Sequence, residues 1–244
     1  MTYHRIIGML AIYNGQQFLK ETLENIVTKI ADINAIHIQD GRWLNSGFTE
    51  MNSTDDTERI ISEFNSDYKY DVQIIYEKSE KIFESPSDKR NHQLARIACH
   101  FEEPYTVFWF DDDEEIRFTT GLERTWVRDS MKTVSVPVTL ATYAYDSNEP
   151  MLTPRFIPGG KGYHFHTERA MCLHDQSCNV IMEWTPKMTT MDKSKYHHDP
   201  EMIIINKWPK RELATQEKRC EFYKHEMMQL AKNSSCKFQG QPES

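Results

Sequence analysis

Paired cysteine motifs, long apolar runs and excess positive charge are all missing from this chain of 244 residues. The five cysteines include no C-x-x-C pair and are odd in number, so we expect reduced thiols in a soluble, cytoplasmic protein. No apolar run approaches the roughly 18 residues that span a bilayer, so we expect no membrane span. Lys and Arg number 29 against 37 Asp and Glu. The resulting net charge of −8 argues against general nucleic-acid binding.

Strand patterns alternate with helix patterns over the first 116 residues. Short apolar runs predict strands at residues 6–12, 35–39, 72–76 and 105–110. Apolar residues at spacings of three and four predict helices that begin at about 16, 57 and 86. Such alternation builds right-handed βαβ units. We therefore predict a Rossmann-like α/β fold, in which helices flank a mixed, mostly parallel sheet.

The second half of the sequence is less regular. Residues 133–139 alternate like a strand, with Pro137 near its end or edge. Residues 154–162 carry three glycines and two prolines, which is typical of a specially shaped loop. A charged helix is predicted at 210–231, and the polar residues after it are expected to fray.

Polar residues follow three of the predicted strands. Asn14 follows the first, Asp40 ends the second, and five consecutive acids, Asp111 to Glu115, follow the fourth. The carboxyl ends of parallel strands share one edge of the sheet, where α/β proteins bind ligands. Five acids beside an apolar strand need compensation from a cation or a hydrogen-bond network. A solvated acidic loop is the alternative interpretation of such a run.

Five motifs, in this order, resemble the family 2 nucleotide-sugar glycosyltransferases, which have the GT-A fold. They are Tyr13-Asn14, Asp40-Gly41, Ser53-x-Asp55-x-Thr57, Lys89-Arg90-Asn91 and Asp111-Asp112-Asp113-Glu114. The chain departs from the family pattern where residues 42–52 are inserted between the second and third motifs. The resemblance implies an inverting hexosyl- or pentosyltransferase that moves a sugar from a nucleoside diphosphate, most often UDP, to an acceptor hydroxyl.

The resemblance also implies one domain over residues 1–244. Its parts are a donor half (1–116), an acceptor half (117–209), a C-terminal helix (210–231) and a flexible tail (232–244).

The donor site follows from the same resemblance. Asp111 and Asp113 are expected to hold Mn²⁺ or Mg²⁺, since carboxylates suit hard cations. Asp40 is expected to accept a hydrogen bond from a uracil or guanine N–H, with a turn-forming Asp-Gly as the alternative. Arg90, near a helix N-terminus, is expected to favour phosphate. The other implied donor-binding positions are Ala11, Tyr13, Asn14, Asp112, Lys210 and Arg211.

The second half offers weaker assignments. Glu168, or else Asp175, is expected to act as the general base that an inverting enzyme needs. His198 is a candidate third metal ligand, although the family pattern would place a histidine at Asn206. Glu114 and Glu115 are expected to form only the solvated edge of the acidic run.

Two other classes of function stay open. A metal-dependent phosphohydrolase or nucleotidyltransferase also gathers carboxylates at strand ends, although residues 13–17 lack the glycine- and lysine-rich signature of the nucleotidyltransferases. A non-catalytic nucleotide- or glycan-binding module would keep the fold without a base. The acceptor, whether glycan, protein, lipid or modified base, does not follow from the sequence.

Overall fold

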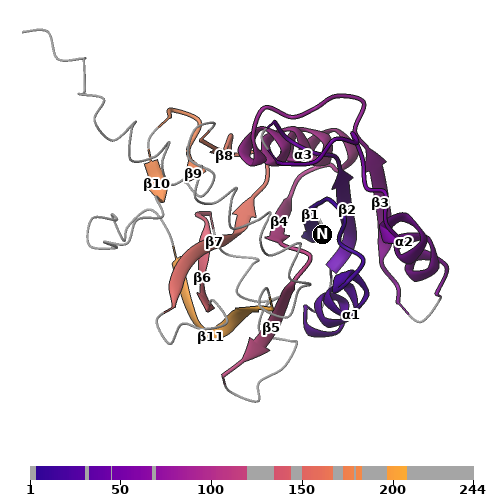
Figure 1. The fold of residues 1–244 in the computed structure, drawn as a ribbon. Coiled ribbons are helices and arrows are strands. Elements are labelled where there is room, and N and C mark those ends of the chain that lie inside the picture. The colour runs from indigo at the N-terminus through magenta and orange to yellow at the C-terminus, as the bar shows by residue number, and fades with distance from the viewer. Residues whose placement is uncertain are drawn as a thin grey trace, which may run out of the picture.

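The structure is a computed structural model that describes residues 4–30, 33–44, 46–67, 70–119, 135–143, 150–166, 173–178, 180–182 and 197–207. Within these ranges, three helices pack on an eight-stranded sheet, and three short strands form a second sheet (Figure 1). No helix in the described ranges is long and apolar enough to cross a membrane. Cys99 and Cys178, both in described ranges, carry free thiols.

The first half alternates strands and helices, as the sequence predicts. Its elements are β1 (Arg5–Ile12), α1 (Leu19–Lys29), β2 (Ile33–Asp40), α2 (Thr57–Ser66), β3 (Gln73–Lys78), α3 (Pro86–His100) and β4 (Tyr105–Phe110). The four strands lie in the order β3-β2-β1-β4, and all of them are parallel.

The second half extends the same sheet and adds a small one. The large sheet gains β5 (Glu114–Phe118), β6 (Val138–Tyr143), β7 (Met151–Pro158) and β11 (His197–Asn206), in the order β4-β7-β6-β11-β5. β6 and β11 are parallel, whereas β7 and β5 run antiparallel to their neighbours. The small sheet consists of β8 (His164–Phe165), β9 (Leu173–His174) and β10 (Val180–Met182). The prediction of a mixed, mostly parallel sheet flanked by helices is confirmed.

Two predictions for the second half are wrong. Of the strand predicted at 133–139, residues 133 and 134 lie outside the described residues, and residues 135–137 are not in a strand. β6 begins at Val138, directly after Pro137, which has no N–H to donate to a ladder. The loop predicted at 154–162 is largely strand β7, which pairs with both β4 and β6. Burial between two strands overrides the prolines, and the carbonyl of Pro154 still accepts a hydrogen bond from Trp109 Nε1. The predicted helix at 210–231 and the tail lie outside the described residues.

The sheet separates two apolar cores because side chains of each strand alternate between its faces. On β1, Leu10 and Ile12 belong to the core that also includes buried residues of α1 and α2. Ile7 and Met9 belong to the other core, together with Ile97 of α3 and Phe165 of β8. Each such side chain contributes roughly 1.5–3 kcal/mol when fully buried, so both faces fix the strands whose ends carry the polar motifs.

Candidate active site

The ends of β1, β2 and β4 meet at one edge of the sheet. In the parallel register, Ile12 lies opposite Asp40, and Leu10 lies opposite Phe110. Asn14, Asp40 and Asp111 therefore emerge at the same edge, as predicted from the parallel order. Ala11, one residue from the end of β1, is half-buried and lies opposite Gln39.

The Ser53-x-Asp55-x-Thr57 motif holds the turn that follows β1. Its three polar side chains accept three consecutive backbone N–H groups of that turn. The bonds run from Asn14 N to Ser53 Oγ (2.8 Å), from Gly15 N to Thr57 Oγ1 (2.9 Å) and from Gln16 N to Asp55 Oδ2 (3.1 Å). Asn14 has a φ of 50°, a left-handed conformation that asparagine tolerates. The motif therefore shapes the first strand end.

Asp40 is fully buried and bonded within the protein. Its carboxylate accepts hydrogen bonds from the backbone N–H of Ser53 (3.1 Å), from Ser53 Oγ (2.8 Å) and from the hydroxyl of Tyr76 (2.8 Å). Burial, and then the charge of Asp40, raises the pKa of Tyr76, so this hydroxyl keeps its proton. Asp40 organises the start of the Ser53 motif, and its contact with a base stays a prediction.

The inserted segment 42–52 packs on the first strand end. The Phe48 ring lies 4.4 Å from that of Tyr13, centroid to centroid, and the Tyr13 hydroxyl donates to the carbonyl of Glu50 at 3.0 Å. Arg42 fixes the segment from within by donating to the carbonyl of Phe48 at 2.9 Å. The inserted segment thus packs against Tyr13 at the end of β1.

The acidic run forms the turn between β4 and β5, and its first three members face different neighbours. The side chain of Asp111 is 36% exposed, and one of its oxygens lies 3.5 Å from Arg90. Asp112 is buried against the turn after β1, where a Cβ on Gly15 would lie 2.7 Å from its Oδ2. Asp113 is buried, and its carbonyl accepts the N–H of Lys207 at 2.7 Å.

Glu114 is not solvated, which corrects the prediction. It pairs with Arg155 through two parallel bonds of 2.9 and 2.7 Å, and both side chains are almost fully buried. Burial raises the pKa of Glu114, while the guanidinium of Arg155 opposes that rise and favours the charged carboxylate. Glu115, by contrast, is partly exposed and pairs with Arg117. The sequence signal for Arg155 is faint: one arginine inside the apolar run Leu152-Thr-Pro-Arg-Phe-Ile157.

The Lys89-Arg90-Asn91 motif joins three parts of the site from the start of α3. Lys89 reaches the ends of β1 and β2. Arg90 lies beside Asp111, with its guanidinium carbon 4.6 Å from the Trp109 ring centroid. Asn91 exchanges two hydrogen bonds of 2.7 Å with the backbone of Phe165 and so attaches β8 to the helix.

The other predicted residues are less close to this edge or cannot be placed. Asp175 follows β9, and its Oδ1 accepts the N–H of Ser177 at 2.9 Å in a turn. His198 lies opposite Thr139, whereas Asn206, near the other end of β11, lies opposite Glu114. β11 has a register shift between Asp199 and Ile203, so His198 and Ile205 lie opposite Thr139 and Tyr143, four residues apart on β6. At about 3.3 Å per residue this separation is roughly 13 Å, so the structure does not bring His198 to the acidic turn. Glu168, Lys210 and Arg211 lie outside the described residues.

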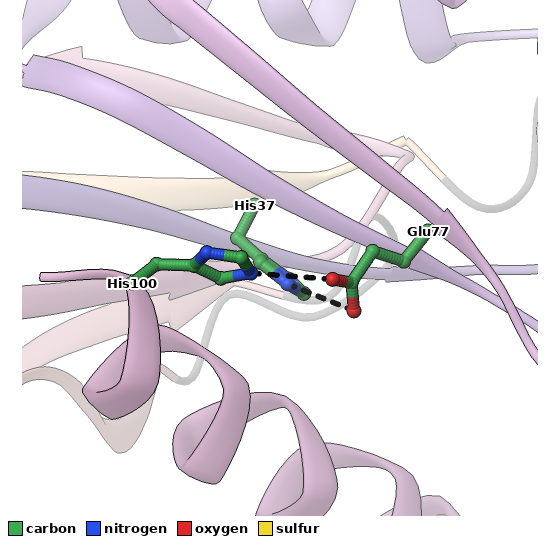
Figure 2. A group of neighbouring side chains, drawn as sticks. All are labelled: His37, Glu77 and His100. Carbon is green, nitrogen blue, oxygen red and sulfur yellow. Dashed lines mark hydrogen bonds and ion pairs between the residues drawn. The ribbon is translucent and has the colours of Figure 1, made fainter.

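A second group with metal-ligand side chains lies elsewhere on the sheet (Figure 2). Glu77 of β3 stands between His37 of β2 and His100 of α3, and its two oxygens lie 3.4 and 3.2 Å from their Nε2 atoms.

The surroundings of this group do not suit a metal ion. Arg96 donates three hydrogen bonds of 2.5 to 3.1 Å to the carboxylate of Glu77 and lowers the pKa of that carboxyl to about 2. The amide nitrogen of Gln93 lies 3.2 Å from Nδ1 of His37 while it donates to two carbonyls. The two amide protons are used by the carbonyls of Leu10 and His37, so Gln93 fixes the backbone of β1 and β2 at this point. We interpret the group as an ion-pair network that holds α3 against β2 and β3.

Comparison with known proteins supports the fold. No family model and no curated protein matches the sequence. The structure resembles S. aureus TarS 1–349 in complex with UDP-GlcNAc, with a TM-score of 0.50 and 13% identity over 87% of this chain and 60% of that one. Other matches are TarS 1–349 with UDP (TM-score 0.42, 14% identity, 64% and 46% covered) and GalNAc-T7 with UDP, GalNAc and Mn²⁺ (0.45, 9%, 83% and 43%).

One of these matches defines the class of fold. The likeness to the complex of TarS with UDP-GlcNAc, at 13% identity, establishes a GT-A-type fold. The chain spans between 22% and 60% of the length of the TarS and GalNAc-T7 chains that it matches. Membership of family 2 stays a prediction.

Proposed function

We propose that this chain is a glycosyltransferase that moves a sugar from a nucleoside diphosphate donor, a UDP-sugar, to an acceptor hydroxyl. The observation that carries the proposal is the convergence of three polar strand ends at one edge of the sheet. The fold adds support, because TarS, which shares it, was crystallised with UDP-GlcNAc.

The acidic turn suits a divalent cation, Mn²⁺ or Mg²⁺. The 3.5 Å separation of Asp111 from Arg90 is longer than a charge-assisted hydrogen bond of about 2.7–2.9 Å. The exposed carboxylate of Asp111, with Asp113 two residues on, therefore offers oxygen ligands of the kind that these ions prefer. Such an ion, when bound, would neutralise the charge that develops on the leaving diphosphate.

Arg90 is the residue proposed to hold the diphosphate. Arg90 lies in the N-terminal part of α3, the helix end that favours anions, and its guanidinium carbon lies 4.6 Å from the Trp109 ring centroid. The aromatic contact holds the guanidinium over the Trp109 ring, on the side where Asp111 lies. Lys210 and Arg211 remain proposed as further phosphate contacts.

An inverting transfer needs a base that takes the proton of the acceptor hydroxyl while the new C–O bond forms and the diphosphate leaves. Glu168 and Asp175 stay the proposed candidates. Asp175 follows β9, which pairs with β8, and Asn91 attaches β8 to α3 beside Arg90. This attachment places the small sheet next to the proposed donor site.

The test is release of nucleoside diphosphate from a panel of UDP-, GDP- and dTDP-sugars, with and without Mn²⁺. We expect Mn²⁺-dependent release of UDP from at least one sugar donor, reduced by a factor of about 100 in Asp113→Asn. Glu115→Gln, a partly exposed acid of the same run, serves as the control and should behave like the wild type. The proposal fails if no donor is bound or hydrolysed and Asp113→Asn is indistinguishable from the wild type.

A further inference from the structure

Lys89 is a buried cation beneath the ends of β1 and β2. Its side chain is 1% exposed, and its ammonium donates to the carbonyls of Ile12 and Gly41 at 2.6 Å each. Ile12 is the last residue of β1, and Gly41 directly follows β2. A buried charge is unfavourable unless it is paired or hydrogen-bonded. Lys89 therefore ties together the two strand ends that carry Tyr13 and Asp40.

The charged groups that influence the pKa of Lys89 also include Asp40, at the end of β2. Burial lowers the pKa of Lys89 to about 7, and the carboxylate that opposes this most strongly is Asp40, followed by Asp112. The hydrogen bonds described for the Asp40 carboxylate come from the neutral groups of Ser53 and Tyr76. Lys89 therefore supplies positive charge that offsets the negative charge of Asp40. The ammonium also lies 5.9 Å from the ring centroid of Trp43, in the inserted segment.

Two consecutive residues of α3 thus serve opposite ends of the site. Arg90 faces the acidic turn through Asp111 and Trp109, whereas Lys89 faces the turn after β1, Asp40 and the insertion. The first end suits a diphosphate and the second a nucleobase, because Tyr13 and Phe48 provide aromatic surface there.

We infer that Lys89 is a positioning residue that shapes a nucleobase pocket at the ends of β1 and β2 and so sets selectivity for the base. The inference rests on the proposed function and deepens it. Lys89 acts through the strand ends and Asp40, since its own donors are directed at backbone carbonyls.

The experiment compares the affinities of UDP and CDP, which differ only in the base, by calorimetry in the presence of Mn²⁺. Lys89→Met and Lys89→Gln are measured beside Lys20→Met, the same substitution at an exposed lysine. We expect the preference of the wild type for UDP over CDP to fall at least about fivefold in both Lys89 variants. Lys20→Met should keep the preference, and Asp113→Asn should weaken both ligands in parallel.

The outcomes separate the two proposals. Binding of neither nucleotide by the wild type overturns the proposed function. Equal binding of both by the wild type, or an unchanged preference in folded Lys89 variants, overturns the role of Lys89 alone. Hydrogen exchange, measured on the wild type alone, tests the same inference without relying on a folded variant. UDP should protect amides 12–16 and 41–44 more than CDP does, and equal protection there contradicts the inference.

Discussion

The acidic turn and the His37–Glu77–His100 group both offer metal-ligand side chains, but their surroundings differ. Around Glu77, the ligand atoms are close together, yet Arg96 neutralises the carboxylate. In the acidic turn, Arg155 neutralises the buried Glu114, while Asp111 stays exposed with only a long ion pair. Local charge balance is thus more informative about a metal site than short distances between ligand atoms.

The largest expected effect is on the buried pair that supports the acidic turn. Arg155→Met leaves the Glu114 carboxylate buried without its partner, so we expect the free energy of unfolding to fall by about 3–5 kcal/mol. Urea denaturation measures this loss. The double change Arg155→Met with Glu114→Leu should recover part of it, because it removes the unpaired charge as well.

The control for this change is Arg59→Met, which breaks exposed pairs with Asp56 and Glu63. Exposed pairs contribute little to stability, so this variant should resemble the wild type. A similar loss in both arginine variants would contradict the distinction between buried and exposed charge.

The second effect is a loss of stability in acid at the His37–Glu77–His100 group. The pKa of His37 is lowered to about 4, mainly by burial, and that of Glu77 to about 2, mainly by Arg96. Since the unfolded chain binds these protons first, stability falls from about pH 6.5 to 4 through His37 and from about pH 4.5 to 2 through Glu77.

The share of His37 amounts to at most about 3 kcal/mol, and denaturant titrations at several pH values measure it. His37→Gln should flatten the curve in the upper window, whereas EDTA should change nothing at neutral pH. A chelator that destabilises the wild type but not His37→Gln would show that the group holds a metal after all.

The first half of the fold could be predicted because each of its strands and helices is encoded by its own local pattern. β1, β2 and β4 are apolar runs, and their common polar edge follows from parallel order alone. The second half could not be predicted in this way. β7 contains Pro154 and Pro158 and is a strand because β4 and β6 bury it from both sides, which no local pattern reveals.

The candidate site, like the fold, could be predicted only in part. The shared position of Asp40 and Asp111 followed from the sequence, but the partner of each acid did not. The bond between Arg155 and Glu114 depends on packing between β7 and the β4–β5 turn, and the distance of His198 from that turn depends on how β11 pairs with β6. Long-range pairing, rather than residue type, decided these points.

Binding of a nucleoside diphosphate to the acidic turn through a divalent cation is the step on which the proposed function depends. The direct test is calorimetric titration of UDP, with and without Mn²⁺, into the wild type, Asp113→Asn and His100→Gln. We expect Mn²⁺-dependent binding that is lost in Asp113→Asn and kept in His100→Gln. Binding that needs no Mn²⁺, or that is lost in His100→Gln and kept in Asp113→Asn, would contradict it.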